Sequence, residues 1–161
     1  MTSSASAPIL SLAELSEKVA GERARGTPII LTNGCFDLLH AGHIRYLTGA
    51  KAIGGFLIAA INSDRRVTEL KGPGRPFINE DERAEIIAAL RPVDAVVVFD
   101  DATVENIILA IKPDFHAKGT DYTEDTVPER EIVRRGGGRV VIVGDPKDHS
   151  STELIERAGK A

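Results

Sequence analysis

The chain has 161 residues, with 20 lysines and arginines against 24 aspartates and glutamates, for a formal net charge of −4. Hydrophobic residues make up 42% of it and charged residues 27%, which is the composition of a globular domain and not of a disordered or fibrous chain. It contains five Phe, two Tyr and no Trp. Such an acidic, aromatic-poor chain lacks the basic surface and the stacking side chains of a general nucleic-acid binder.

The cysteine count and the apolar runs indicate the compartment. Cys35 is the only cysteine, which excludes an intramolecular disulfide and fits a reducing environment. The densest apolar run, Phe56 to Ile61, is far shorter than the ~20 residues that span a bilayer. The N-terminus lacks the basic start and the apolar core of a secretory signal. We expect a cytoplasmic protein with no membrane partner.

The first part of the chain predicts helices and strands in alternation. Residues 1–10 are rich in Ser and Ala and are expected to be a disordered lead-in to a single domain over residues 11–161. Ser11 and Glu14 form a capping box, which predicts a helix up to about Arg25. Apolar runs at residues 28–32 and 56–61 predict buried strands, and a helix is expected between them at about residues 41–53.

The second part of the chain continues this alternation. Residues 71–76 predict a Gly/Pro loop, and Asn79 with Glu82 predicts a second capped helix. Strands are predicted at residues 95–99, 114–118 and 139–143, and helices at 104–111 and 150–158. Apolar strands that alternate with helices favour a parallel sheet covered on both faces. We therefore expect an α/β fold, a single Rossmann-like, doubly wound, parallel five-stranded sheet with ligands at the carboxyl ends of its strands.

The strongest local motif is Thr32-Asn-Gly-Cys-Phe-Asp-Leu-Leu-His-Ala-Gly-His43, where the first strand meets its helix. His40 and His43 are three residues apart, so they share a face of the first helical turn, and Gly42 leaves room for close approach to the backbone. A helix N-terminus attracts anions, and imidazoles can donate hydrogen bonds to phosphate oxygens. The motif therefore predicts a phosphate site, the alternative being a histidine pair with no ligand.

The segment Gly34-Cys-Phe-Asp-Leu-Leu-His-Ala-Gly-His43 resembles the GxFDxxHxGH signature of the HxGH nucleotidyltransferase superfamily. That group includes glycerol-phosphate cytidylyltransferases and phosphopantetheine adenylyltransferases. The resemblance covers roughly residues 28–158. Within the superfamily, the motifs of this chain are most similar to those of the heptose 1-phosphate adenylyltransferases. Its further segments stand in the family's order: Asn62-Ser-Asp64, Lys71 to Pro76, Arg83, Lys118-Gly-Thr-Asp-Tyr122 and Ser150-Ser-Thr152.

The resemblance implies transfer of AMP from ATP to D-glycero-β-D-manno-heptose 1-phosphate, or, as the alternative, cytidylyl transfer to glycerol 3-phosphate or another polyol or sugar phosphate. It implies Mg²⁺ on the triphosphate, held by phosphate oxygens and water with no protein side chain as a ligand. The resemblance implies ATP and a sugar phosphate as the ligands. It also implies a homodimer or a higher homo-oligomer, since dimers are usual in this family.

The resemblance also implies roles for individual residues. The catalytic residues would be His40, His43, Lys71 and Lys118. Nucleotide binding would involve Asn33, Gly34, Phe36, Gly42, Arg83, Lys118, Gly119, Asp121, Ser150, Ser151 and Thr152. The sugar phosphate would be bound by Asp37, Asn62, Asp64, Lys71 and Arg75, where Asp37 either orients a sugar hydroxyl or caps the helix that follows.

Two positions depart from the family pattern. Thr120 stands where the heptose enzymes have a second glycine, and this leaves the identity of the sugar more open than the chemistry. Asp148 and His149 stand just ahead of the last helix, where the superfamily commonly has a hydrophobic residue. That second departure bears on the preference for one nucleotide base.

Three other hypotheses belong to different classes of protein. A metal enzyme would use His40 and His43 with His116 or Asp37, but no further spacing supports a tetrahedral site. A thiol nucleophile would be Cys35, but no catalytic cysteine signature surrounds it. A nucleotide-binding sensor without catalysis would not require the complete motif set that this chain retains.

Overall fold

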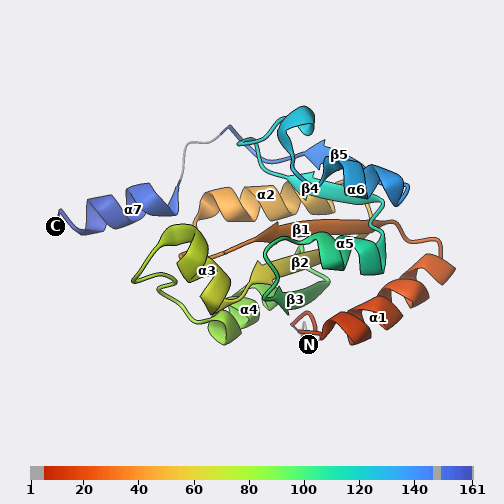
Figure 1. Cartoon of the computed structure of the whole chain (residues 1–161), viewed down its shortest axis with the longest axis horizontal. Coiled ribbons are helices and arrows are strands. Elements are labelled where there is room, and N and C mark those ends of the chain that lie inside the picture. Colours follow the sequence, from red (N-terminus) through yellow and green to blue (C-terminus); the bar gives the residue numbers. More distant parts are fainter. Residues whose placement is uncertain (1–5, 147–149, 161) are drawn as a thin grey trace.

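The computed structural model describes residues 6–146 and 150–160 (Figure 1). In chain order the elements are α1 (Leu12–Ala24), β1 (Ile29–Gly34), α2 (Ala41–Lys51), β2 (Phe56–Asn62), α3 (Asp64–Lys71), α4 (Glu80–Ala88), β3 (Ala95–Phe99), α5 (Glu105–Ile111), β4 (Phe115–Lys118), the 3₁₀ turn η1 (Glu124–Thr126), α6 (Arg130–Arg135), β5 (Arg139–Ile142) and α7 (Ser151–Ala158).

The five strands form one parallel sheet in the order β3-β2-β1-β4-β5. Helices α1, α5 and α6 pack on one face, where Leu31 of β1 is buried, and α2 and α4 pack on the other, where Ile30 is buried (Figure 1). Successive residues of a strand point to opposite faces, so a strand buried on both sides is apolar throughout. The predicted α/β fold with a doubly wound, parallel five-stranded sheet is confirmed.

The start of the chain corrects one expectation. Residues 7–10 are not a disordered lead-in, because they run beside β3 and form hydrogen bonds with it. The Leu10 N–H donates to the Val96 carbonyl over 2.8 Å, and the Val96 N–H donates to the Pro8 carbonyl over 2.9 Å. Ile9 pairs with Val96 in a parallel bridge. The part of the expectation that concerns residues 1–5 lies outside the described residues.

Two helices and the 3₁₀ turn were not expected from the sequence. Helix α3 buries only Val67, so it has no apolar stripe to detect, although the Ser63 side chain caps it by accepting from the Arg66 N–H. Helix α6 has six residues and buries only Val133. Short helices with one buried residue depend on tertiary packing, which sequence periodicity does not report.

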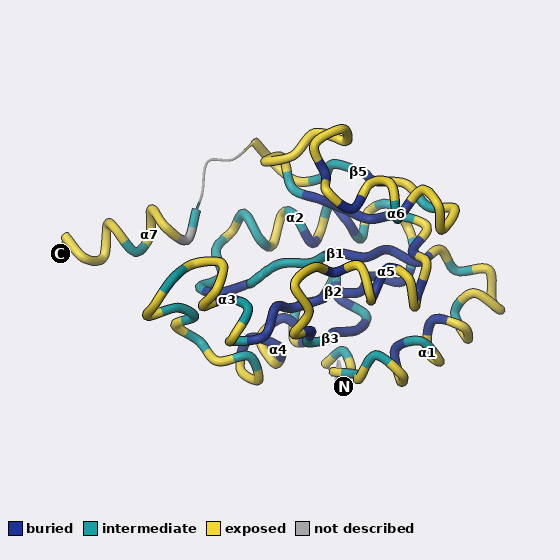
Figure 2. The backbone as a smooth tube through the Cα atoms, viewed as in Figure 1, coloured by how far each residue is buried: buried dark blue, intermediate teal, exposed yellow. Residues whose placement is uncertain are grey.

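Burial follows the layers of the fold (Figure 2). The chain is buried along β2 and along most of β1, whereas α7 is mostly exposed and projects from the body of the domain. Among residues 6–146 and 150–160, the helices are all too short or too polar to cross a membrane.

Candidate active site

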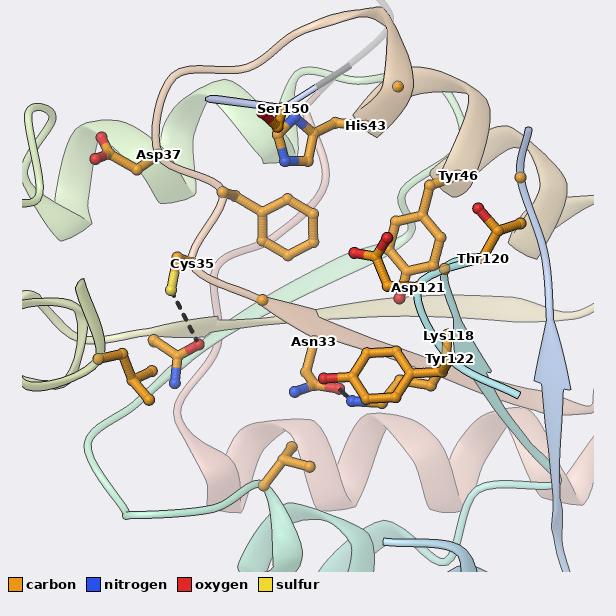
Figure 3. Close-up of a pocket in the computed structure, with 18 of the residues that line it drawn as sticks. Asn33, Cys35, Asp37, His43, Tyr46, Lys118, Thr120, Asp121, Tyr122 and Ser150 are labelled. Atoms are coloured by element: carbon orange, nitrogen blue, oxygen red, sulfur yellow. Dashed lines mark hydrogen bonds between the residues drawn. The ribbon is translucent and has the colours of Figure 1, made fainter. Parts of the chain in front are cut away.

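A cleft of about 590 Å³ opens at the carboxyl ends of the central strands (Figure 3). This is the edge at which parallel α/β sheets bind ligands. Residues from β1, β2, β4 and the loops that follow them line the cleft, together with the start of α7. The predicted site residues found there are Asn33, Gly34, Phe36, Asp37, His40, Gly42, His43, Asn62, Lys71, Arg75, Lys118, Gly119, Asp121, Ser150 and Thr152.

The two histidines sit at the N-terminus of α2 with their Nδ1 atoms turned to the backbone. His40 is the N-cap, and its Nδ1 accepts from the Gly42 N–H over 3.1 Å. The Nδ1 of His43 accepts from the His40 N–H over 3.3 Å. The centres of the two imidazole rings lie 4.0 Å apart. A ring nitrogen that accepts a hydrogen bond carries no proton, and therefore each neutral ring carries its proton on Nε2.

The electrostatics favour the neutral form of His43. Burial lowers its pKa to about 4, and the neighbouring His40 contributes to the same shift. The Phe36 ring packs 5.7 Å from the His43 ring and is almost fully buried.

The loop that leads to the histidines has a strained backbone. Phe36 and Leu38 both have φ 49°, a left-handed conformation that non-glycine residues seldom adopt. The packed surroundings hold this strained loop, as is common at functional sites.

A buried polar network forms the floor of the cleft below Lys118. The Lys118 Nζ donates to the Asn33 Oδ1 over 3.0 Å and lies 3.5 Å from a Glu129 carboxylate oxygen. It also lies 5.0 Å from the centre of the Tyr122 ring, and both side chains are drawn in Figure 3. Burial lowers the pKa of Lys118, whereas Glu129 opposes the shift. Lys118 is 6% exposed, so its ammonium is fixed in place.

The opposite end of the cleft carries Lys71 and Arg75, on the segment that leaves α3. Lys71 is exposed, and among the described residues it has no ion-pair partner within 4 Å. The Arg75 Nε donates to the Asp37 carboxylate over 2.8 Å, and that carboxylate also accepts from the backbone N–H groups of Phe77 and Ile78. Burial opposes the shift, but these donors together lower the pKa of Asp37. Asp37 anchors this segment and does not cap α2, whose N-cap is His40.

Arg83 and Asp64 are not brought to the cleft, contrary to the expectation for both. Arg83 is 1% exposed, and its guanidinium donates to the carbonyls of Ile78, Cys35 and Asn62 and to the Asp64 carboxylate. It is a structural residue that joins the ends of β1 and β2 to the start of α4. A buried arginine with this many partners is taken up by the fold and has little capacity left for a nucleotide.

Several cleft residues were not predicted as site residues. The Tyr46 hydroxyl donates to the Ala117 carbonyl over 2.7 Å and is buried, which raises its pKa. Arg45 pairs with Asp145 at 2.9 Å, and the Thr120 hydroxyl donates to the Asp145 carbonyl over 2.7 Å. These contacts join α2 and the loop after β4 to the loop after β5. They link segments far apart in sequence, and no local motif marks them.

The start of α7 brings Ser150 and Thr152 to the cleft. Ser150 is the N-cap, and its hydroxyl accepts from the Glu153 N–H over 3.1 Å. The Ser151 side chain, Asp148 and His149 lie outside the described residues, so their predicted roles are not addressed by the structure.

The thiol and metal hypotheses receive no support from the described residues. Burial raises the pKa of Cys35, which disfavours the thiolate that a nucleophile requires. No group of three or more His, Cys, Asp or Glu side chains in residues 6–146 and 150–160 is arranged to hold a metal ion. The His116 ring lies under the cleft, with its Nε2 at 2.9 Å from the Asn33 Oδ1.

Comparison with known proteins places the chain in a family. The family model described as cytidylyltransferase-like matches residues 31–157. The bifunctional protein HldE of Trichlorobacter lovleyi is 47% identical over 143 residues, which are 89% of this chain and 29% of that protein. HldE of Geobacter sulfurreducens is 45% identical over 155 residues, which are 96% of this chain and 32% of that protein. The chain thus spans about a third of the length of these relatives.

A solved structure resembles about three quarters of this chain. The crystal structure of the lipopolysaccharide core biosynthesis protein from Thermoplasma volcanium superposes with a TM-score of 0.65 at 25% identity, covering 76% of this chain and 100% of that one. The family match includes the histidine loop, the floor of the cleft and the start of α7. The chain therefore belongs to the cytidylyltransferase-like family of nucleotidyltransferases.

Proposed function

We propose that this nucleotidyltransferase transfers AMP from ATP to D-glycero-β-D-manno-heptose 1-phosphate in the cytoplasm. A phosphate oxygen of the sugar phosphate attacks the α-phosphorus of ATP and forms a new P–O bond. The bond from the α-phosphorus to the α–β bridging oxygen breaks, and its electron pair leaves with pyrophosphate. The products are ADP-heptose and pyrophosphate, and no covalent enzyme intermediate is required.

The hydrogen bonds made by the Nδ1 atoms of the histidine pair are the observation that carries this proposal. Because both Nδ1 atoms accept from backbone N–H groups, the rings offer Nε2–H as their donor. Charge develops on the α- and β-phosphate oxygens as the bond to pyrophosphate breaks. Donors fixed in advance at the positive end of a helix stabilise that charge without reorganising. His40 and His43 are therefore the proposed catalytic donors.

The remaining roles divide between the two ends of the cleft. Lys118, Asn33, Gly119 and Asp121 lie at the end proposed for the nucleotide, with Ser150 and Thr152 at the N-terminus of α7. That helix start, including the Ser151 backbone, suits the β- and γ-phosphates. At the other end, Lys71 is the proposed partner of the sugar phosphate, with Arg75 and Asn62 beside it.

Mg²⁺ fits this site as an ion carried by the triphosphate. Three carboxylates of the cleft already pair with cations: Asp37 with Arg75, Glu129 with Lys118, and Asp145 with Arg45. Phosphate oxygens and water would hold the ion, which neutralises charge on the leaving pyrophosphate. The protein contributes the positions of the cationic and imidazole donors around it.

The heptose acceptor is proposed from the relatives. Bifunctional HldE proteins are similar in sequence to most of this chain, and one structural neighbour is a lipopolysaccharide core biosynthesis protein. If this chain acts in the same route, its product feeds the synthesis of a cell-envelope polysaccharide. A homodimer or a higher homo-oligomer is proposed on the resemblance to the family alone.

A pyrophosphate-release assay tests the proposal. Four nucleoside triphosphates, each with Mg²⁺, are crossed with heptose 1-phosphate, glycerol 3-phosphate and other sugar phosphates. We expect the highest kcat/KM for ATP with the heptose 1-phosphate. A mock purification from host cells that do not express the protein is the blank for contaminating activity. Absence of release above that blank with every pair would overturn the assignment as an enzyme.

The second candidate is a cytidylyltransferase that acts on glycerol 3-phosphate or another polyol phosphate. The matched family model is described as cytidylyltransferase-like, and Thr120 departs from the heptose enzymes. The same assay decides between the candidates, because a preference for CTP over ATP would replace the first with the second.

A further inference from the structure

A fully buried histidine lies next to the cleft and has no role in the reaction proposed above. His116 is 0% exposed and sits on β4, two residues before Lys118. Residues two apart on a strand point to the same face, so the two side chains lie on one side of the sheet. In the register of β4 against β1, His116 is opposite Leu31, which places it diagonally next to Asn33.

The side chains of His116 and Lys118 both contact the amide oxygen of Asn33. His116 Nε2 lies 2.9 Å from the Asn33 Oδ1, and Lys118 Nζ lies 3.0 Å from the same oxygen. An amide oxygen can only accept, so the His116 ring must carry its proton on Nε2. Two donors on one oxygen fix the amide, and its NH₂ group then points away from Lys118, as Figure 3 shows.

The other nitrogen of the ring shows what this arrangement costs. His116 Nδ1 is buried and has no hydrogen-bond partner in the part of the chain that the structure describes. A buried polar atom without a partner is destabilising, and an apolar side chain at this position would avoid that cost. Burial, assisted by the positive charge of Lys118, lowers the pKa of His116 to about 3. The ring therefore stays neutral and keeps the Nε2–H that the contact with Asn33 needs.

We propose that His116 is a positioning residue that fixes the Asn33 amide so that its two N–H groups face a substrate oxygen in the cleft. The proposal rests on the proposed function for the identity of the substrate. An NH₂ group can only donate, so the site accepts a phosphate or hydroxyl oxygen and rejects a donor at that point. The oxygen belongs either to the nucleotide or to the sugar phosphate.

A set of variants tests whether His116 acts through Asn33. His116→Leu removes the donor, His116→Gln retains an N–H, and Asn33→Ala removes the group that is positioned. By calorimetry with MgATP alone and with heptose 1-phosphate alone, we expect His116→Leu to weaken the affinity for one of them about tenfold, the loss expected for one hydrogen bond. The ligand that loses affinity identifies the source of the oxygen. We expect His116→Gln to have most of the wild-type affinity, because it retains an N–H donor. In His116→Leu we expect kcat to differ from the wild-type value by less than about threefold.

The double variant His116→Leu/Asn33→Ala separates positioning from a general structural effect. If His116 works through Asn33, the double variant is no weaker than Asn33→Ala alone. Additive losses would overturn the proposal, as would unchanged affinity for both ligands in His116→Leu. Val140→Ala is the matched control, because Val140 is buried beside His116 in the register of β5 and makes no contact with the Asn33 oxygen among the described hydrogen bonds.

A measurement without substrate keeps the test independent of the proposed function. ¹⁵N NMR of the free protein reports the imidazole tautomer of His116 and the side-chain amide of Asn33. We expect a neutral Nε2–H ring at pH 7 and a shift of the Asn33 amide signals in His116→Leu but not in Val140→Ala. A ring protonated on Nδ1, or Asn33 signals that do not move, would overturn the positioning role. Wild-type protein that binds no MgATP would instead contradict the proposed function.

Discussion

The two ends of the cleft hold their lysines in opposite ways. Lys118 is 6% exposed and is held by Asn33, Glu129 and the ring of Tyr122. Lys71 is exposed at the end of α3, next to a Gly/Pro loop, with no ion-pair partner within 4 Å among the described residues. One ammonium is fixed before any substrate arrives, and the other is free to move.

This difference indicates a division of labour. A fixed, partly desolvated donor stabilises developing charge well, because it does not need to reorganise during the reaction. A mobile, solvated lysine attracts an anion and closes on it, and it acts more on binding than on the chemical step. We therefore infer that the nucleotide end carries the catalysis and that the Lys71 end captures the second substrate.

The largest expected effect tests whether the donors at the nucleotide end of the cleft carry the chemistry. His40→Ala or His43→Ala should lower kcat by about two to four orders of magnitude, because each change removes a preorganised donor. Steady-state pyrophosphate release measures this, with calorimetric MgATP binding as a check on the ground state. Turnover near the wild-type value in either variant would remove that histidine from the catalytic role.

The next effect concerns Lys118. Lys118→Met should lower kcat about a hundredfold to a thousandfold, as loss of a fixed donor does elsewhere. Because this change leaves the Glu129 carboxylate buried without its cation, Lys118→Met/Glu129→Gln is the control for misfolding. A double variant that folds normally but remains as slow supports a catalytic role for the lysine. Recovery of kcat in the double variant would show that Lys118 serves only to neutralise Glu129.

A smaller effect, of another kind, is expected at Lys71. Lys71→Ala should raise the KM of the sugar phosphate about tenfold and leave the affinity for MgATP unchanged, and the loss should shrink as salt rises. Kinetics at two ionic strengths measure this, with Lys18→Ala on α1 as the matched control for loss of a surface charge. A fall in kcat with unchanged KM would contradict the division of labour between the two ends.

The last effect is on the stability of the folded chain and comes from His116. The pKa of His116 is about 3 in the folded chain against 6.5 for an ordinary histidine. The unfolded chain therefore takes up a proton as the pH falls below about 6.5, and the folded chain does not until about pH 3. The free energy of unfolding should fall by up to about 1.4 kcal/mol per pH unit in that window. His43, with a pKa of about 4, adds to the fall.

Urea denaturation at pH 7 and pH 5 measures this pH dependence. His116→Gln should lose the contribution of His116, whereas Lys71→Ala should keep the wild-type slope. An identical pH dependence in His116→Gln and the wild type would show that His116 is not the buried neutral base inferred here.

The sequence was a sufficient guide to the fold wherever burial is continuous. The apolar runs at Phe56–Asn62 and Ala95–Phe99 are buried strands and were found within a residue or two. Helix α3 was missed because only Val67 is buried in it, and the pairing of residues 7–10 was missed because it depends on the distant edge of β3. Local patterns carry no record of such partners.

The candidate site could be predicted in its residue types but not in its partners. The spacing of His40 and His43 predicts that they share a site, and both line the cleft. Nothing in the motif shows that their Nδ1 atoms accept hydrogen bonds from the backbone. Arg83 follows a polar helix start, which reads as an accessible cation, although it is buried under the ends of β1 and β2. His116 stands within an apolar strand, and only the strand register places it beside Asn33.

The pairing of residues 7–10 with β3 also bears on the behaviour of the protein at high concentration. An open parallel sheet has two edges, each with backbone groups able to recruit a strand of another molecule. At the β3 edge, Pro8 and Leu10 already occupy the Val96 amide and carbonyl. A chain shortened to begin at Ser11 should therefore self-associate more readily, which light scattering would detect. These residues, read from the sequence as a tail, serve as a guard against aggregation.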